Sequence, residues 1–176
     1  LFVAALTMGC GGSPPGSPVD SEGAVGRFTS IAIGADGLAL ISYMSSGSGT
    51  LVGSGLEDPL EVAESTPTPG TASLKVAHCA DIQCASATTA TLDDGHVGRG
   101  TSIAIGSDGL GIVSYFDIAN GDLKVAHCSD VQCATATIAT LDSEGEVGQS
   151  TSIAIGTDGL AIISYLDVTN GDLKVA

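Results

Sequence analysis

The chain has 176 residues, and its 20 Asp and Glu outnumber its 5 Lys and Arg, so the formal net charge is −15. This balance opposes binding to nucleic acid or to anionic membrane surfaces, because such partners are bound through Lys and Arg. Apolar residues make up 43% and charged residues only 14%, which excludes a disordered acidic tail. The 25 Gly and the absence of Trp favour short strands joined by tight turns.

The first ten residues, LFVAALTMGC, form an apolar run that ends at Gly9-Cys10. The run is too short to span a bilayer as a helix, and it lacks the basic region that opens an export signal, so we interpret residues 1–10 as a truncated signal. It resembles the lipobox of bacterial lipoproteins, although Thr7 stands where lipoboxes prefer Leu. The resemblance implies lipidation of Cys10 and anchoring to the cell envelope, at the outer membrane or the cell surface. An ordinary secretory signal is the alternative.

Residues 11–24 begin with a stretch rich in Gly, Ser and Pro and are expected to form a flexible tether. The remaining chain contains three copies of one sequence repeat, which are recognised by TSIAIGADGL, TSIAIGSDGL and TSIAIGTDGL. We divide it into repeat 25–96, repeat 97–146 and the partial repeat 147–176. The first repeat carries an insertion at about 45–72, whose SSGSG and TPTPG motifs predict a surface excursion. Because the third repeat stops before its own Cys pair, we expect the chain to be a fragment of a longer array.

Each repeat contains four strand-like runs separated by turn signals. In the second repeat the runs are about Thr101–Gly106, Leu110–Phe116, Leu123–Cys128 and Thr135–Leu141. Ser107-Asp108-Gly109 and Asn120-Gly121 supply the residues that tight hairpins require. Short connections make neighbouring strands antiparallel, so each repeat is predicted to be a four-stranded meander.

The second run of this repeat, LGIVSYF, is apolar on both faces. Ile112 and Phe116 point to one side of the strand, and Val113 and Tyr115 point to the other. A sheet of this kind needs cover on both faces, which identical sheets stacked face to face provide. The expected fold is therefore all-β, a β-propeller-like array of four-stranded antiparallel blades that is incomplete here. An open β-solenoid is the alternative, although the Asn-Gly hairpin argues against parallel coils.

The run SIAIGxDGLxxISYxDxxNGDLKVAHCxxxxC resembles tandem repeats of secreted bacterial lipoproteins, especially myxobacterial ones. It is similar more distantly to the Asp-box blades of sialidase-type propellers. The Asp-box places a residue between Asp and Gly and ends in Trp, whereas here Gly109 follows Asp108 directly and Trp is absent. The sialidase resemblance therefore implies the fold alone.

The sequence contains candidate disulfides and candidate metal ligands. Two cysteine pairs hold the same place in their repeats, Cys79 with Cys84 and Cys128 with Cys133, and in an exported protein they predict disulfides. A zinc site is disfavoured, because His127 and Cys128 are adjacent on a strand and point to opposite faces. A weak set of calcium candidates lies in the DIANGD and DVTNGD turns, and the predicted ligands are Asp117, Asn120, Asp122, Asp167, Asn170 and Asp172. A sialidase clamp needs three Arg, but Gln149 replaces the Arg found at positions 27 and 99, so no catalytic residues are predicted.

The sequence therefore predicts a non-enzymatic, lipid-anchored envelope protein that binds or scaffolds other molecules. With few aromatic side chains to stack on sugars, a protein partner is favoured, and a glycan-binding or degenerate glycoside-hydrolase-like propeller is the alternative. No cofactor is expected apart from the calcium candidates, and no nucleic acid partner is expected.

Overall fold

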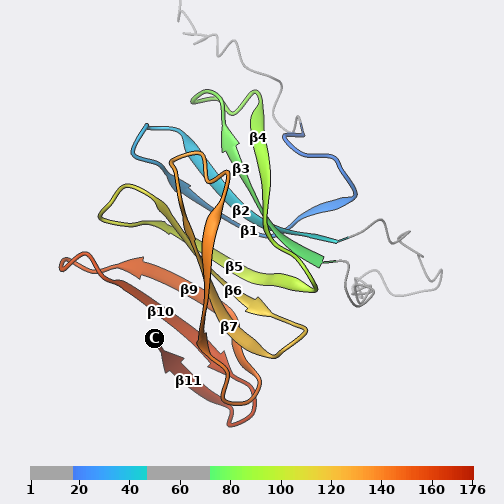
Figure 1. Ribbon diagram of the computed structural model, residues 1–176, viewed down its shortest axis with the longest axis vertical. Coiled ribbons are helices and arrows are strands. Elements are labelled where there is room, and N and C mark those ends of the chain that lie inside the picture. Colours follow the sequence, from blue (N-terminus) through green and yellow to red (C-terminus); the bar gives the residue numbers. More distant parts are fainter. Residues whose placement is uncertain (1–17, 47–71) are drawn as a thin grey trace, which may run out of the picture.

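The computed structural model describes residues 18–46 and 72–176, and within these ranges every regular element is a β-strand. Cys10 and most of the predicted insertion lie outside the described residues. The strands form three separate antiparallel sheets, which Figure 1 shows following one another along the long axis of the molecule. This arrangement confirms the predicted all-β fold and the antiparallel pairing within each repeat.

The first sheet contains β1 (Ala24–Ile33), β2 (Ala39–Ser46), β3 (Ala72–Cys79) and β4 (Ala87–Asp93). The second contains β5 (Val97–Ile105), β6 (Gly111–Asp117), β7 (Asp122–Cys128) and β8 (Ala136–Asp142). The third contains β9 (Val147–Ile155), β10 (Ala161–Asp167) and β11 (Asp172–Val175). In every sheet the spatial order of the strands follows the chain, so each sheet is a meander.

The hairpin between β5 and β6 shows why the DG motif recurs. Gly106 N–H donates to Leu110 C=O at 2.8 Å, and Leu110 N–H donates to the Asp108 carboxylate at 3.0 Å. Gly109 has a φ of 81°, which a residue with a side chain rarely adopts. The aspartate therefore closes the turn from its side chain, and the glycine permits the backbone to reverse.

The first strand of each sheet starts earlier than the sequence pattern predicts. We expected the first strand of the second repeat near Thr101, whereas β5 starts at Val97. Its pairing with β6 shifts register between Val97 and Arg99 and again before Ser102, which marks a bulged segment. A bulge disrupts the alternation of side chains, so a search for alternating apolar residues does not detect this part of the strand.

Apolar side chains fill the two spaces between consecutive sheets. Between the first and second sheets, Leu74 and Val76 belong to one buried cluster with Val113 and Tyr115. Between the second and third sheets, Leu123 is buried with the corresponding residues of the third sheet, Val147, Ile153, Ile163 and Tyr165. The middle sheet is thus covered on both faces, as its sequence predicts.

Two glycines let the sheets approach closely. A Cβ on Gly98 would lie 3.0 Å from the Leu74 Cα, and a Cβ on Gly148 would lie 2.6 Å from the Leu123 Cα. Both glycines also have positive φ, at 91° and 97°. Each leucine therefore inserts against the bulged strand of the following sheet at a place where a side chain would collide with it.

Hydroxyl groups join the first strands of neighbouring sheets. Ser30 Oγ accepts a hydrogen bond from Ile103 N–H, and Ser102 Oγ accepts one from Ile153 N–H, both at 3.2 Å. Deeper in the second interface, the buried Ser114 hydroxyl donates to Thr151 Oγ1 at 2.8 Å. These bonds lie at equivalent positions of the repeat, so the two interfaces have the same geometry.

The folded unit starts before the point assigned to the end of the tether. Asp20 lies within the predicted tether 11–24, yet its carboxylate accepts hydrogen bonds from Tyr43 Oη at 2.6 Å and Lys75 Nζ at 2.5 Å. Composition alone does not reveal this bond, because its two donors come from strands β2 and β3. The segment that begins at Asp20 therefore packs against the first sheet before β1 starts.

Candidate functional site

The four cysteines of the repeats form two disulfides, Cys79–Cys84 and Cys128–Cys133. Each pair closes the connection between the third and fourth strands of its sheet, at the position expected from the sequence. The second cysteine of each pair has a positive φ, 51° at Cys84 and 55° at Cys133. These cysteines therefore serve the structure of a tight loop and are not free thiols.

An Asp–Tyr–Lys cluster is repeated once per sheet. In the second sheet the Tyr115 hydroxyl donates to the Asp93 carboxylate at 2.6 Å, and Lys124 Nζ lies 3.3 Å from the same oxygen. In the third sheet Tyr165 donates to Asp142 at 2.7 Å, and Lys174 also contacts Asp142. Asp93 and Asp142 end the last strand of the preceding sheet, so these two clusters each join two sheets, whereas the corresponding Asp20 lies in the segment before β1.

Burial and hydrogen bonding shift the pKa values of several groups in these clusters. Burial disfavours the Asp20 carboxylate, but hydrogen bonds from Lys75 and Tyr43 outweigh it and lower the pKa of Asp20 to about 2. The Lys174 hydrogen bond, followed by that of Tyr165, lowers the pKa of Asp142 to about 2. Burial and the Asp93 hydrogen bond raise the pKa of Tyr115. These tyrosines are therefore hydrogen-bond donors to carboxylates and are not poised as nucleophiles.

The predicted calcium ligands are already engaged in the turns between the second and third strands. Asp117 is 1% exposed, and its carboxylate accepts hydrogen bonds from the Ala119 and Asn120 backbone, the Asn120 side chain and Lys124. Asp167 likewise accepts from the backbone and side chain of Asn170. Within residues 18–46 and 72–176, no group of three or more His, Cys, Asp or Glu is placed to hold a metal ion.

The geometry of these turns therefore favours structure over metal binding. Asn120 and Asn170 use their side-chain amide groups as donors to the neighbouring aspartate. Asp122 and Asp172 begin the following strands, β7 and β11, where they face Asp117 and Asp167 across the hairpin. An aspartate that accepts several hydrogen bonds caps the turn, and a calcium ion would have to replace those donors.

Two of the three histidines also hold local structure. His78 Nε2 lies 2.9 Å from the Asp36 carboxylate, and His127 Nε2 lies 2.9 Å from Asp108. Each pair links the third strand to the hairpin between the first and second strands of the same sheet. The pairs recur in register, so we assign them to the fold rather than to catalysis.

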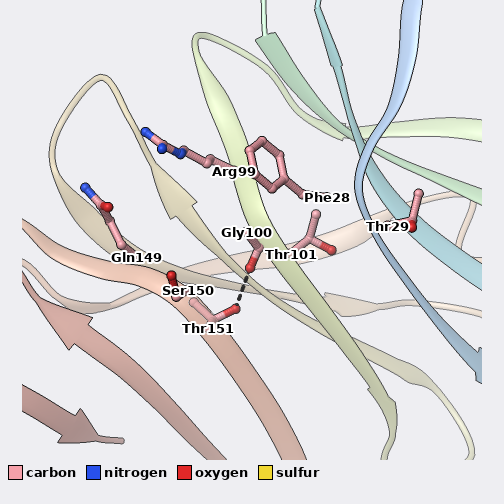
Figure 2. Close-up of a pocket in the computed structure, with 8 residues that line it drawn as sticks. All are labelled: Phe28, Thr29, Arg99, Gly100, Thr101, Gln149, Ser150 and Thr151. Atoms are coloured by element: carbon pink, nitrogen blue, oxygen red, sulfur yellow. Dashed lines mark hydrogen bonds between the residues drawn. The ribbon is translucent and has the colours of Figure 1, made fainter. Parts of the chain in front are cut away.

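A pocket of about 350 Å³, which we call the bulge pocket, opens where the bulged segments of β1, β5 and β9 meet. Phe28, Gly100 and Ser150 hold the same place in the three repeats, and all have positive φ, at 53°, 61° and 53°. A positive φ at Phe28 and Ser150 costs conformational energy, and such strain concentrates at functional sites. Figure 2 shows the lining residues: Phe28, Thr29, Arg99, Gly100, Thr101, Gln149, Ser150 and Thr151.

Two arginines flank the ring of Phe28 at the edge of this pocket. The guanidinium carbons of Arg27 and Arg99 each lie 5.9 Å from the ring centroid. The three lysines all form ion pairs with aspartates, whereas in the described parts of the chain neither arginine does. In Figure 2, Arg99 lies beside the Phe28 ring and Gln149 points to the same side. The bulge pocket therefore gathers positive charge and hydrogen-bond donors on a protein of strongly negative net charge.

The side chains of the lining are of kinds that bind polar ligands. Thr151 donates to Gly100 C=O at 2.9 Å, which fixes its hydroxyl in the wall between β5 and β9. The Gln149 amide donates to the Glu146 carboxylate at 2.7 Å, just outside the lining. Guanidinium, amide and hydroxyl groups such as these bind anions and polar ligands.

The repeats contain a sequence signal for this site that lies outside the motifs described above. Arg27, Arg99 and Gln149 occupy equivalent positions, and each is followed by a residue that also differs between repeats, whereas the flanking TSIAIG is invariant. These two adjacent positions vary although the Val-Gly before them and the TSIAIG after them are invariant, which marks a place where the repeats need not be equivalent. The bulge, and with it the pocket, required the backbone geometry.

No family model and no curated protein match this chain. Among solved structures, it is similar to the endo-arabinase from Bacteroides thetaiotaomicron VPI-5482, with 16% sequence identity and a TM-score of 0.47. The match covers 84% of this chain and 53% of the endo-arabinase, so the chain spans about half the length of that protein. A similarity of this size carries no functional conclusion. Within the described ranges there is also no helix with the length and apolarity needed to cross a membrane.

Proposed function

We propose that this chain is part of a non-catalytic binding module, in which the three sheets are consecutive blades of a β-propeller-type array. The ligand binds at the bulge pocket. The observation that carries the proposal is that the variable, strained segments of three otherwise matching repeats converge on one pocket. Arg99 lines this pocket and Arg27 lies over the ring of Phe28 in its wall, and neither arginine has an ion-pair partner in the described chain.

The propeller arrangement is supported by how the sheets pack. The first two sheets are four-stranded meanders, and the third contains the first three strands of the same meander. The first strands, β1, β5 and β9, lie side by side and are joined through serine hydroxyls. Propeller blades pack face to face with their first strands nearest the common axis. The bulge pocket lies at one end of these first strands, where ligands of propeller-type folds can reach several blades at once.

A protein partner is the favoured ligand, through an acidic side chain or chain terminus that enters the bulge pocket. Arg27 and Arg99 already occupy positions over the Phe28 ring, which leaves little of that ring for stacking on a sugar. A glycan ligand remains the second candidate only for sugars that carry a carboxylate. In either case the positive groups of the pocket, rather than the acidic remainder of the surface, provide the attraction.

The test combines binding and turnover on the full chain. Titration calorimetry with short acidic peptides, with uronic-acid oligosaccharides and with neutral oligosaccharides of equal length should show saturable binding to an acidic probe. Arg99→Gln should weaken that binding by about tenfold, since a charge-assisted hydrogen bond contributes roughly 1.5–3 kcal/mol. The control is Gln83→Ala, in the exposed connection between β3 and β4 and outside the pocket lining. Release of sugar products by the chain, or equal binding by Arg99→Gln, would contradict the proposal.

We further propose that Cys10 carries a lipid that attaches the module to the bacterial cell envelope. The support is the lipobox-like run before Cys10 and the odd number of cysteines, of which four are paired in disulfides. Cys10→Ser, expressed behind a complete lipoprotein signal, should move the protein from the membrane to the soluble fraction. An unchanged distribution between fractions would show that Cys10 is not the anchor.

A further inference from the structure

We propose that the ligand of the bulge pocket is an extended peptide segment in which an acidic residue and a lysine stand two positions apart, with the lysine bound by Glu146 in an adjoining pocket. The adjoining pocket, which we call the Glu146 pocket, has a volume of about 410 Å³. The inference rests on the proposed function, because it takes the acidic residue of the ligand to lie in the bulge pocket. It adds a second, opposite charge to that ligand.

The two pockets are neighbouring parts of one groove. Arg99 lines both of them. Gln149 lines the bulge pocket, and its amide donates at 2.7 Å to the carboxylate of Glu146, which lines the Glu146 pocket. A negative charge therefore stands one hydrogen bond away from the part of the groove that gathers positive charge.

The lining of the Glu146 pocket suits a long side chain with a positive end. Its residues belong to the second sheet or to the connection from β8 to β9. Phe116, Ile118 and Ala119 supply apolar surface, and Glu146 supplies an exposed carboxylate. A lysine packs its methylene stem along apolar surface and keeps its ammonium group in water. A second acidic residue of the ligand would instead be repelled by Glu146.

The carboxylate at position 146 is not required by the repeated fold. Ala24, His96 and Glu146 hold the same place, directly before the invariant Val-Gly pair. The Glu146 carbonyl accepts a hydrogen bond from Val168 N–H, and the His96 carbonyl accepts the equivalent bond from Ile118 N–H. The backbone therefore makes the connection between sheets with either side chain. The charge of Glu146 is left to act on a ligand.

The charge of the whole chain also favours a ligand with both signs of charge. The net charge of −15 repels a segment that carries negative charge alone. One acidic residue and one lysine cancel, which removes this long-range repulsion, and each then meets an opposite charge, at Arg99 and at Glu146. In an extended chain, residues two positions apart point to the same face and are separated by about 7 Å, so both side chains can enter the groove.

The experiment uses titration calorimetry of the full chain with blocked peptides of equal length. Their central residues are Asp-Ala-Ala, Asp-Ala-Asp, Asp-Ala-Lys and the reversed Lys-Ala-Asp, between identical uncharged flanks. One of the two lysine peptides should bind about two- to fivefold more tightly than Asp-Ala-Ala, which is the contribution of an exposed ion pair. Asp-Ala-Asp should bind more weakly than Asp-Ala-Ala.

Glu146→Gln assigns the preference to the carboxylate, since it keeps an acceptor oxygen and the backbone bonds. This variant should lose the preference for lysine and should bind Asp-Ala-Asp more tightly, so the two peptides respond in opposite directions. A general disturbance of the groove would change both in the same direction. The matched control is Glu144→Gln, which removes the same charge at an exposed residue outside the lining of both pockets and should preserve the order of the peptides.

The outcomes separate this inference from the proposed function. Equal binding of Asp-Ala-Ala and both lysine peptides, or the same change from Glu144→Gln as from Glu146→Gln, would overturn the role of Glu146. The proposed function would still hold in that case if Asp-Ala-Ala binds and Arg99→Gln weakens it. Failure of every acidic peptide to bind would overturn both.

Discussion

Replacing Leu123 with Ala tests directly whether the sheets are held together by the leucine that inserts between them. Leu123 is 0% exposed, lies in the buried cluster with Val147 and Tyr165, and contacts the position of Gly148. Truncating a fully buried leucine costs about 2–5 kcal/mol of unfolding free energy, as lost burial and a residual cavity. The facing backbone at Gly148 already lies against Leu123 and limits collapse around the gap, so we expect the upper half of that range.

The matched control is Leu173→Ala, which makes the same chemical change at the equivalent position of the third sheet. Leu173 is 79% exposed, so its truncation should change the stability of a dilute, monomeric sample by less than about 0.5 kcal/mol. Urea unfolding followed by far-ultraviolet circular dichroism gives both values from the midpoint and slope. Equal effects of the two substitutions would refute the assignment of Leu123 to a packed interface between sheets.

Three further outcomes are expected. In the folded protein the pKa of Asp142 is about 2, below its ordinary value of 3.8, so the stability that this carboxylate contributes is complete above about pH 4 and is lost as the pH falls toward 2. In urea unfolding across this range, Asp142→Asn should lose less stability than wild type. Parallel stability curves for the two proteins would exclude this contribution of Asp142. Gly148→Ala should destabilise the protein far more than Gly26→Ala. Both substitutions place a side chain at a positive φ, but only the first adds a Cβ that would lie 2.6 Å from a backbone atom. Similar melting temperatures of the two variants would contradict the close approach of the sheets. Replacing both Cys128 and Cys133 with Ala should cost about 2 kcal/mol or somewhat more, since the disulfide closes only a short loop. Free thiols in the unreduced protein would show that the bridge is not formed.

Much of the fold could be predicted from the sequence because its determinants are local. Alternating apolar residues specify the strands, and Asp108-Gly109 and Asn120-Gly121 specify the turns between them. The apolar character of both sides of β6 indicated that sheets must stack, and the structure buries Val113 on one side of that strand and Phe116 on the other. The two disulfides could also be predicted from the sequence, since only five positions separate the cysteines of each pair.

The candidate site could be predicted only in part. The sequence showed that Arg27, Arg99 and Gln149 are equivalent, but the bulges that bring the variable segments together interrupt the alternation on which strand prediction depends. The aspartates of the DIANGD and DVTNGD turns suggested calcium by residue type. Their hydrogen bonds, which no sequence pattern records, show that Asp117 is occupied by donors of its own turn and by Lys124.

The sequence by itself thus determined the strands, their turns and the need for stacking, because hydrogen bonding and burial along a single strand act on residues near one another in the chain. Only the tertiary structure decided which sheet surface meets which, and therefore the roles of Asp20, Leu74 and Gly98. Leu74 and Gly98 are 24 positions apart and belong to different sheets, and their contact depends on a left-handed glycine within a bulge. Such a contact depends on how all the side chains of two sheets pack together, so no local sequence pattern predicts it.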